Sequence, residues 1–159
     1  METTDPKTVK IYLACDHAGF NLKEQVKKHL MARQQQIADM GTDSLESANY
    51  IEFGARAAKE VSQAPESARA ILICGSGIGM SMVANKFKNV RAALCHDEYA
   101  AEMSRRHNNA NVLTLGARVI DPRTALNIVD IWLTTEFDGG RHQLRLEYLQ
   151  QAVEQKNFK

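Results

Sequence analysis

Short apolar runs alternate along this chain with stretches in which apolar residues recur every three or four positions. The apolar runs predict strands. The second pattern predicts helices, because residues three and four positions apart share one helical face, as Leu22, Val26 and Leu30 do. The predicted strands span 9–14, 36–40, 70–74, 90–95 and 111–115, and the predicted helices span 20–33, 51–62, 83–87, 97–107, 124–134 and 144–154.

Strands that alternate with helices build a parallel sheet, because each crossover between parallel strands needs a connecting segment such as a helix. We therefore predict an α/β chain with a single-domain, Rossmann-like, three-layer fold: a five-stranded parallel sheet with helices on both faces. The 159 residues fit one domain, 1–159, in which only 1–8 and 155–159 are expected to be loose ends. A strand order of 2-1-3-4-5 would place a ligand crevice between the first and third strands, at their carboxyl ends.

The composition narrows the class of function. The chain has 20 basic and 19 acidic residues and a net charge of +1, so it has no global attraction to nucleic acid or to a membrane surface. No apolar stretch approaches the roughly 20 residues that span a bilayer, and the polar start is not typical of a signal peptide. Three cysteines, without the spacing of a disulfide framework, indicate a reducing compartment and a cytoplasmic location.

The most informative motif is the glycine-rich loop after the predicted strand 70–74. Cys74 ends this strand, and the residues that follow at 75–81 read G-S-G-I-G-M-S. A strand, a tight glycine turn and a helix start place the thiol beside backbone amides and the positive end of a helix dipole, which favours the thiolate. Glycine amides can also hold an anion. A base beside an anion hole suggests chemistry on a small anionic substrate, whereas a glycine turn with an inert buried cysteine is the simpler alternative.

Several known sites do not fit this motif. A P-loop would need Lys where Met80 stands, a dinucleotide-binding loop would read G-x-G-x-x-G after the first strand, and a cysteine phosphatase loop would need Arg in place of Met80. Cys15, Cys74 and Cys95 all end predicted strands, so a three-thiolate metal site is conceivable. No C-x-x-C spacing or His pair supports it, and we expect no metal.

Other polar residues lie at the ends of predicted elements. Asp16 and His17 follow the first strand and would face the same crevice as Cys74, although a helix N-cap would explain them equally well if they stood alone. Arg118 follows the fifth strand, at the same edge of the sheet.

A second set of polar residues lies near the predicted helix ends of the carboxyl-terminal half. His107 and its two neighbouring asparagines could form a helix C-cap. Arg141 and Arg145 lie one helical turn apart, which suits a phosphate, although surface ion pairs are the alternative.

Five segments in one order resemble ribose-5-phosphate isomerase type B, whose family includes the galactose-6-phosphate isomerase subunits. The resemblance runs from about residue 10 to residue 153. It implies interconversion of ribose 5-phosphate and ribulose 5-phosphate in the pentose phosphate pathway, without metal or cofactor, by a homodimer or a dimer of dimers with shared active sites. The segments are C-D-H-A-G-F at 15–20, I-C-G-S-G-I-G-M-S at 73–81, A-N-K at 84–86, H-N-N at 107–109 and G-G-R-H-Q-L-R at 139–145.

The resemblance also implies roles for single residues. It makes Cys74 the base that moves a proton between C1 and C2 through an enediolate, since a second branch of the family has Glu where Met80 stands here. Ser76 would lie near the substrate hydroxyls, and Asp16 and His107 would open the furanose ring. The residues implied for substrate binding are His17, Gly75, Gly77, Ile78, Gly79, Met80, Asn108, Arg118, Arg141 and Arg145, with 75–80 forming the amide hole for the enediolate.

One segment departs from the family pattern. The family has Asp-Tyr-Pro where this chain has N-Y-I at 49–51, which affects the geometry of that loop and the substrate preference. The size of the sugar that binds depends on the depth of the crevice, which the sequence alone does not determine. A six-carbon substrate such as allose or galactose 6-phosphate is therefore an alternative. A non-catalytic sugar-phosphate sensor is a further alternative, but a sensor would not need Cys74, Asp16 and His107 together.

Overall fold

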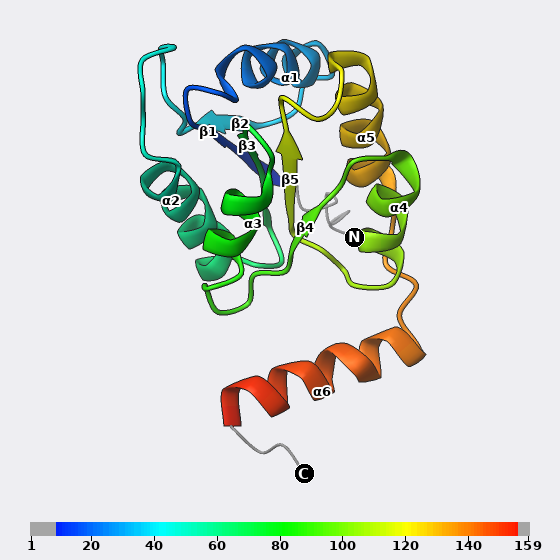
Figure 1. Cartoon of the computed structure of the whole chain (residues 1–159). Coiled ribbons are helices and arrows are strands. Elements are labelled where there is room, and N and C mark those ends of the chain that lie inside the picture. Colours follow the sequence, from blue (N-terminus) through cyan, green and yellow to red (C-terminus); the bar gives the residue numbers. More distant parts are fainter. Residues whose placement is uncertain (1–8, 156–159) are drawn as a thin grey trace, which may run out of the picture.

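A five-stranded parallel sheet forms the centre of the fold, with helices on both faces (Figure 1). The computed structural model describes residues 9–155. The expected loose ends at 1–8 and 156–159 lie outside these residues, whereas residue 155 is helical. The elements are β1 (Lys10–Cys15), α1 (Phe20–Ala32), β2 (Ile37–Asp39), α2 (Tyr50–Gln63), β3 (Ala68–Cys74), α3 (Ile78–Ala84), β4 (Ala92–Leu94), α4 (Glu98–Arg106), β5 (Val112–Gly116), α5 (Pro122–Thr134) and α6 (Arg141–Gln155).

The strand order is β2-β1-β3-β5-β4, so the predicted order is wrong at one edge. β5 pairs with β3, Cys74 lying opposite Gly116, and β4 is the edge strand. Every residue of β5 is buried, whereas those of β4 are half-buried. This difference in burial follows from position, because a strand inside a parallel sheet is covered on both faces and an edge strand is not. β1 and β3 are neighbours as predicted, so the strand order still reverses between them, at the place where the crevice is expected.

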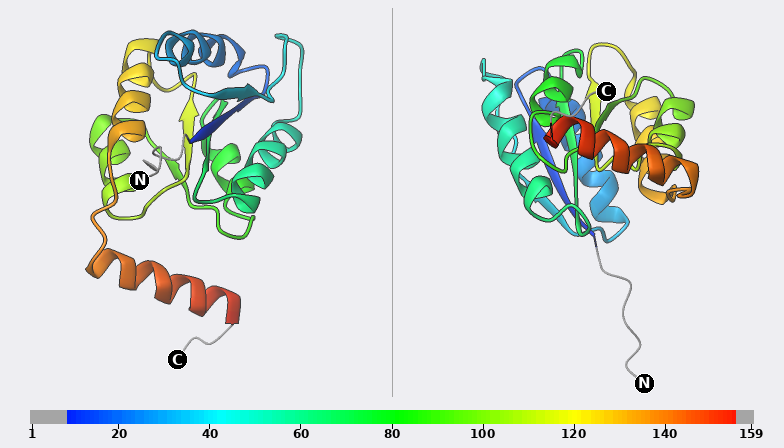
Figure 2. Two further views of the ribbon diagram at one scale, coloured as in Figure 1. Left: turned by 180° about the vertical axis from the view of Figure 1, so that it is seen from behind. Right: turned by 90° about the horizontal axis from the view of Figure 1, so that it is seen from below.

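Helices cover both faces of the sheet (Figure 2), and because successive residues of each strand point to opposite faces, the sheet has two cores. Ile71 and Ile73 of β3 pack on the face covered by α1, α4 and α5, with Trp132 fully buried among them. Leu72 and Cys74 belong to the other core, which α2 and α3 cover. Cys74 is therefore turned toward α3, the helix that follows its own glycine loop.

Two helices differ from the predicted ranges by three or more residues at an end, and the others by one or two. α3 spans Ile78–Ala84. It begins directly after the glycine turn because Gly77, its N-cap residue, adopts a left-handed φ of 77° from which the helix starts. α6 begins at Arg141 and stands away from the body (Figures 1 and 2). Within residues 9–155, no helix combines the length and the apolarity that crossing a membrane requires.

A groove of about 1300 Å³ separates α6 from the body of the fold. Residues 85–93 and the end of α4 line one wall, and α6 lines the other. Several large apolar side chains of α6 stay exposed in this single chain: Leu144, Tyr148, Leu149 and Val153. An apolar helix face beside an open groove is typical of a surface that another chain covers.

Candidate functional site

Cys74 lies at the carboxyl end of β3, and the glycine turn folds back onto its sulfur. The backbone N–H of Gly77 donates a hydrogen bond to Cys74 Sγ at 3.2 Å. The left-handed conformation of Gly77 makes this possible, and a Cβ at that position would also collide with Leu94. The thiol is 5% exposed and lies next to the loop amides, the arrangement that the sequence predicted.

Asp16 directly follows β1, next to the strand β3 that ends in Cys74. Its N–H donates to the carbonyl of Ile73, the residue before Cys74, at 3.3 Å. Its Oδ1 accepts from the N–H of Gly19 at 3.1 Å, and because Gly19 is the N-cap residue of α1, Asp16 stabilises the turn before the helix and is not its N-cap. Among the described residues Oδ2 has no hydrogen-bond partner, so this oxygen is available to a ligand. Asp16 therefore combines a structural contact with an unpaired oxygen at the carboxyl edge of the sheet.

His17 and Arg118 flank the same edge. Nδ1 of His17 accepts from the N–H of Ala48 at 3.1 Å, so the neutral ring carries its proton on Nε2. The N–H of Arg118 donates to the Gly75 carbonyl at 3.0 Å, and its Nη1 lies 3.3 Å from where a Cβ on Gly75 would stand. The Arg118 side chain thus lies beside the glycine loop, and the His17 ring contacts the segment before α2. We call Asp16, His17, Cys74, residues 75–80 and Arg118 the carboxyl-edge group.

The segment that departs from the family pattern also contacts this group. Asn49 caps α2, and its Oδ1 accepts from the N–H of Ile51, the group that a proline there would lack. The Tyr50 ring packs so closely on Gly79 that a Cβ at Gly79 would lie 2.7 Å from it. The N-Y-I segment therefore starts α2 with a side-chain cap and places an aromatic ring against the glycine loop. The sequence analysis did not identify Tyr50 as part of the site.

The remaining predicted residues lie at the opposite end of the sheet. α4 runs from the carboxyl end of β4 back to the amino end of β5, and His107 is its C-cap residue. Cys74 pairs with Gly116, the last residue of β5, whereas His107 precedes the first residue of β5, Val112. The length of β5 from Val112 to Gly116 is about 13 Å, and this length separates the two ends of the sheet. One chain therefore cannot bring His107 to Cys74. We call His107, Asn108, Arg141 and Arg145 the amino-edge group.

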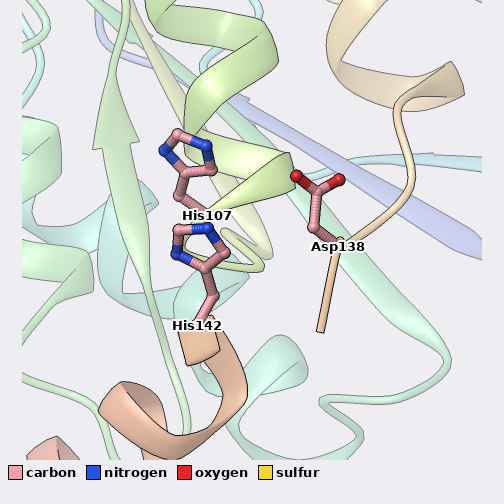
Figure 3. A group of neighbouring side chains, drawn as sticks. All are labelled: His107, Asp138 and His142. Atoms are coloured by element: carbon pink, nitrogen blue, oxygen red, sulfur yellow. The ribbon is translucent and has the colours of Figure 1, made fainter. Parts of the chain in front are cut away.

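His107 lies in a cluster with Asp138 and His142 (Figure 3). The two imidazoles are stacked, with ring centroids 4.2 Å apart and planes 9° from parallel. Both oxygens of Asp138 accept from Nε of Arg106, at 3.1 and 3.2 Å, and this bond lowers the pKa of Asp138. His142 was not identified from the sequence, where its one signal was its place between two arginines.

The donor atoms of this cluster lie within 4.8 Å of one another, so its fit to a metal ion can be tested. The lone pairs of two parallel rings do not converge on one ion, and Arg106 already occupies the carboxylate. Burial lowers the pKa of His142, and the positive charges of His107, Arg141 and Arg145 lower it further. Such surroundings favour an anion over a cation.

The other two cysteines lie apart from this chemistry. Burial raises the pKa of Cys15 to about 12 and that of Cys95 to about 11, so both stay protonated at neutral pH. β5 separates the strand before Cys95 from β3, and no cysteine belongs to a metal-binding cluster within the described residues. The conceivable three-thiolate site is therefore not formed.

Comparison with known proteins gives a consistent result. The profile of the Ribose/Galactose Isomerase family matches residues 11–149. Ribose-5-phosphate isomerase B of Escherichia coli is 44% identical over 147 residues, which cover 92% of this chain and 97% of that protein. The structure of ribose-5-phosphate isomerase B from Clostridium thermocellum has a TM-score of 0.89 at 43% identity, covering 94% of this chain and 100% of that one. The Mycoplasma genitalium enzyme, solved with bound ribulose-5-phosphate, gives 0.90 at 36% identity and covers 94% and 99%.

Proposed function

This chain belongs to the ribose/galactose isomerase family, and on that basis we propose that it interconverts ribose 5-phosphate and ribulose 5-phosphate. The resemblance predicted from the five segments is confirmed. The observation that carries the proposal is the Cys74 thiol, held by the Gly77 N–H at the carboxyl edge of the sheet. This contact supports a role for Cys74 as the proton acceptor, next to amides that can stabilise an enediolate.

The isomerisation moves one proton between C1 and C2, so one base can remove and return it. We assign this role to Cys74. Negative charge grows on the substrate oxygen as the proton leaves, and preorganised amide donors such as those of 75–80 contribute roughly 3–4 kcal/mol each. Ser76 would contact the substrate hydroxyls, while its Oγ accepts from the N–H of Ile78 at 3.3 Å in this structure.

The cyclic sugar must open before this proton can move. We assign ring opening to Asp16, through its free Oδ2, and to His107, which would protonate the ring oxygen. Arg141 and Arg145 would hold the phosphate, because each offers charge-assisted hydrogen bonds. The phosphate anchors the end of the sugar that does not react, and its binding energy positions the reacting carbons.

These assignments need two chains. The carboxyl-edge and amino-edge groups lie at opposite ends of one sheet, so we propose a homodimer, or a dimer of dimers, in which each site combines one group from each chain. The groove beside α6 supports this arrangement, because Asn108 lines it next to the exposed apolar side chains of that helix. A second copy entering the groove would bury those side chains and reach the amino-edge group.

We also propose that the protein works in the cytoplasm. All three cysteines are free in the structure, which suits a reducing compartment. The small net charge of +1 gives no reason to expect nucleic acid or a membrane surface as a partner.

Incubation with ribose 5-phosphate, with ketose formation followed by absorbance, tests the function. Cys74→Ala should abolish turnover while sugar-phosphate binding stays within a few fold, because the thiol supplies the base and the arginines supply the anchoring. Cys95→Ala is the matched control and should keep near-normal turnover. A panel that includes allose and galactose 6-phosphates tests the substrate size. Near-normal turnover by Cys74→Ala would contradict the mechanism.

A further inference from the structure

The His107–His142 stack joins two elements that otherwise stand apart. His107 ends α4, and His142 lies in the first turn of α6, the helix that extends away from the body (Figures 1 and 3). His142 is 8% exposed, whereas most of its neighbours on α6 are exposed. The burial of one polar ring at the base of an exposed helix indicates a specific contact.

The segment before α6 fixes this contact. The N–H of Asp138 donates to the carbonyl of Arg106 at 3.0 Å, and the Arg106 side chain returns two bonds to the Asp138 carboxylate. Backbone and side chain thus hold the linker against the end of α4. The N–H of His142 then donates to the Gly139 carbonyl at 3.0 Å, which starts α6 with the His142 ring over His107.

The charges around the pair keep the second ring neutral. The groups that face the pair are Arg106 from α4, Asp138 from the linker, and Arg141 and Arg145 from α6. Burial and the surrounding positive charges lower the pKa of His142, so at neutral pH this ring is uncharged. A neutral aromatic face can hold a neighbouring ring without competing for its proton.

We propose that His142 is a positioning residue, which acts by stacking on His107 and fixing the plane in which that imidazole meets the sugar ring oxygen. The proposal rests on the proposed function, in which His107 opens the ring. Proton transfer through a misplaced group is slow, since a displacement of about 1 Å can cost roughly 100-fold in rate. The stack would therefore affect ring opening and leave the Cys74 step unchanged.

The test compares two reactions of the same enzyme. His142→Ala should lower net conversion of ribose 5-phosphate by roughly 10- to 100-fold. Proton exchange at C1 of ribulose 5-phosphate should stay within about threefold, because this ketose cannot close a five-membered ring through its phosphorylated C5 oxygen. His142→Phe keeps a stacking face without polar atoms and should restore conversion to within about threefold of the wild type. His29→Ala, which removes an imidazole remote from the site, is the control.

Other outcomes overturn the proposal. If His142→Phe is as slow as His142→Ala and inorganic phosphate inhibits both less, His142 is a phosphate ligand. If His142→Ala loses both reactions equally and melts at a lower temperature, its role is structural. His107→Ala, measured in the same two assays, separates the proposal from its premise. Equal loss of both reactions in that variant would refute the ring-opening role of His107 itself, and unchanged conversion in His142→Ala alone would refute the positioning role.

Discussion

A mixture of two inactive variants should be active if each site is shared between chains. Cys74→Ala removes the proposed base from the carboxyl-edge group, and His107→Ala removes the proposed ring-opening acid from the amino-edge group. Acid and base must each lie within about 3 Å of the substrate atoms they serve. In one chain the two residues are separated by at least the length of β5, about 13 Å, so no substrate position serves both.

The expected activity follows from two-fold symmetry. A mixed dimer has one intact site and one site that carries both substitutions. Random pairing makes about half of the dimers mixed, and half of the sites in each are intact, so about a quarter of the wild-type activity should return. The assay is co-refolding of the two variants, with ketose formation measured by absorbance and subunit exchange confirmed by mass spectrometry of isotope-labelled chains.

A matched pair of variants provides the control. Cys74→Ala and Asp16→Ala both damage the carboxyl-edge group, so every site of their mixed dimer lacks one of the two residues. That mixture should stay inactive. If subunit exchange is confirmed and the mixture of Cys74→Ala with His107→Ala also stays inactive, the shared-site reasoning is wrong.

Two further predictions concern the anchoring of the phosphate and the stability of the fold. Arg141→Ala and Arg145→Ala should each raise KM roughly 10- to 100-fold through loss of a charge-assisted contact, and should weaken inhibition by inorganic phosphate. Arg56→Ala, an exposed arginine on α2, is the control, and normal binding by both site variants would make the two residues surface ion pairs. Asp39→Asn should lower the free energy of unfolding by about 2 kcal/mol at pH 7, because the buried Lys23 ammonium loses its 2.7 Å bond to that carboxylate. Burial opposes the charged form, but the lysine hydrogen bonds outweigh it and lower the pKa of Asp39. The wild type should therefore lose this contribution as the pH falls below about 4, and urea unfolding curves that respond equally to pH in both proteins would contradict it.

The sequence by itself determined the features that depend on neighbouring residues. The alternation of apolar runs and helical patterns gave the α/β class and all five strands, because side-chain periodicity reflects local backbone geometry. The turn after Cys74 was also predictable from its glycines, since the left-handed conformation of Gly77 needs a residue without a Cβ. Helix boundaries were less well predicted: α3 begins five residues earlier than expected, because the turn itself starts the helix.

The tertiary structure decided what depends on distant residues. The exchange of β4 and β5 depends on which strand pairs with β3, and the local pattern of two short apolar segments does not rank them. The stacking of His142 on His107 depends on the bonds between Asp138 and Arg106, which join two elements far apart in the chain. The crossover direction of α4 sends His107 to the edge opposite Cys74, so the motifs that the resemblance assigns to sites shared between chains lie at two ends of one sheet. The direction of a crossover and the neighbours of a strand are set only when the strands pair. Both depend on contacts between segments that are distant in the sequence, and no local pattern of residues encodes them.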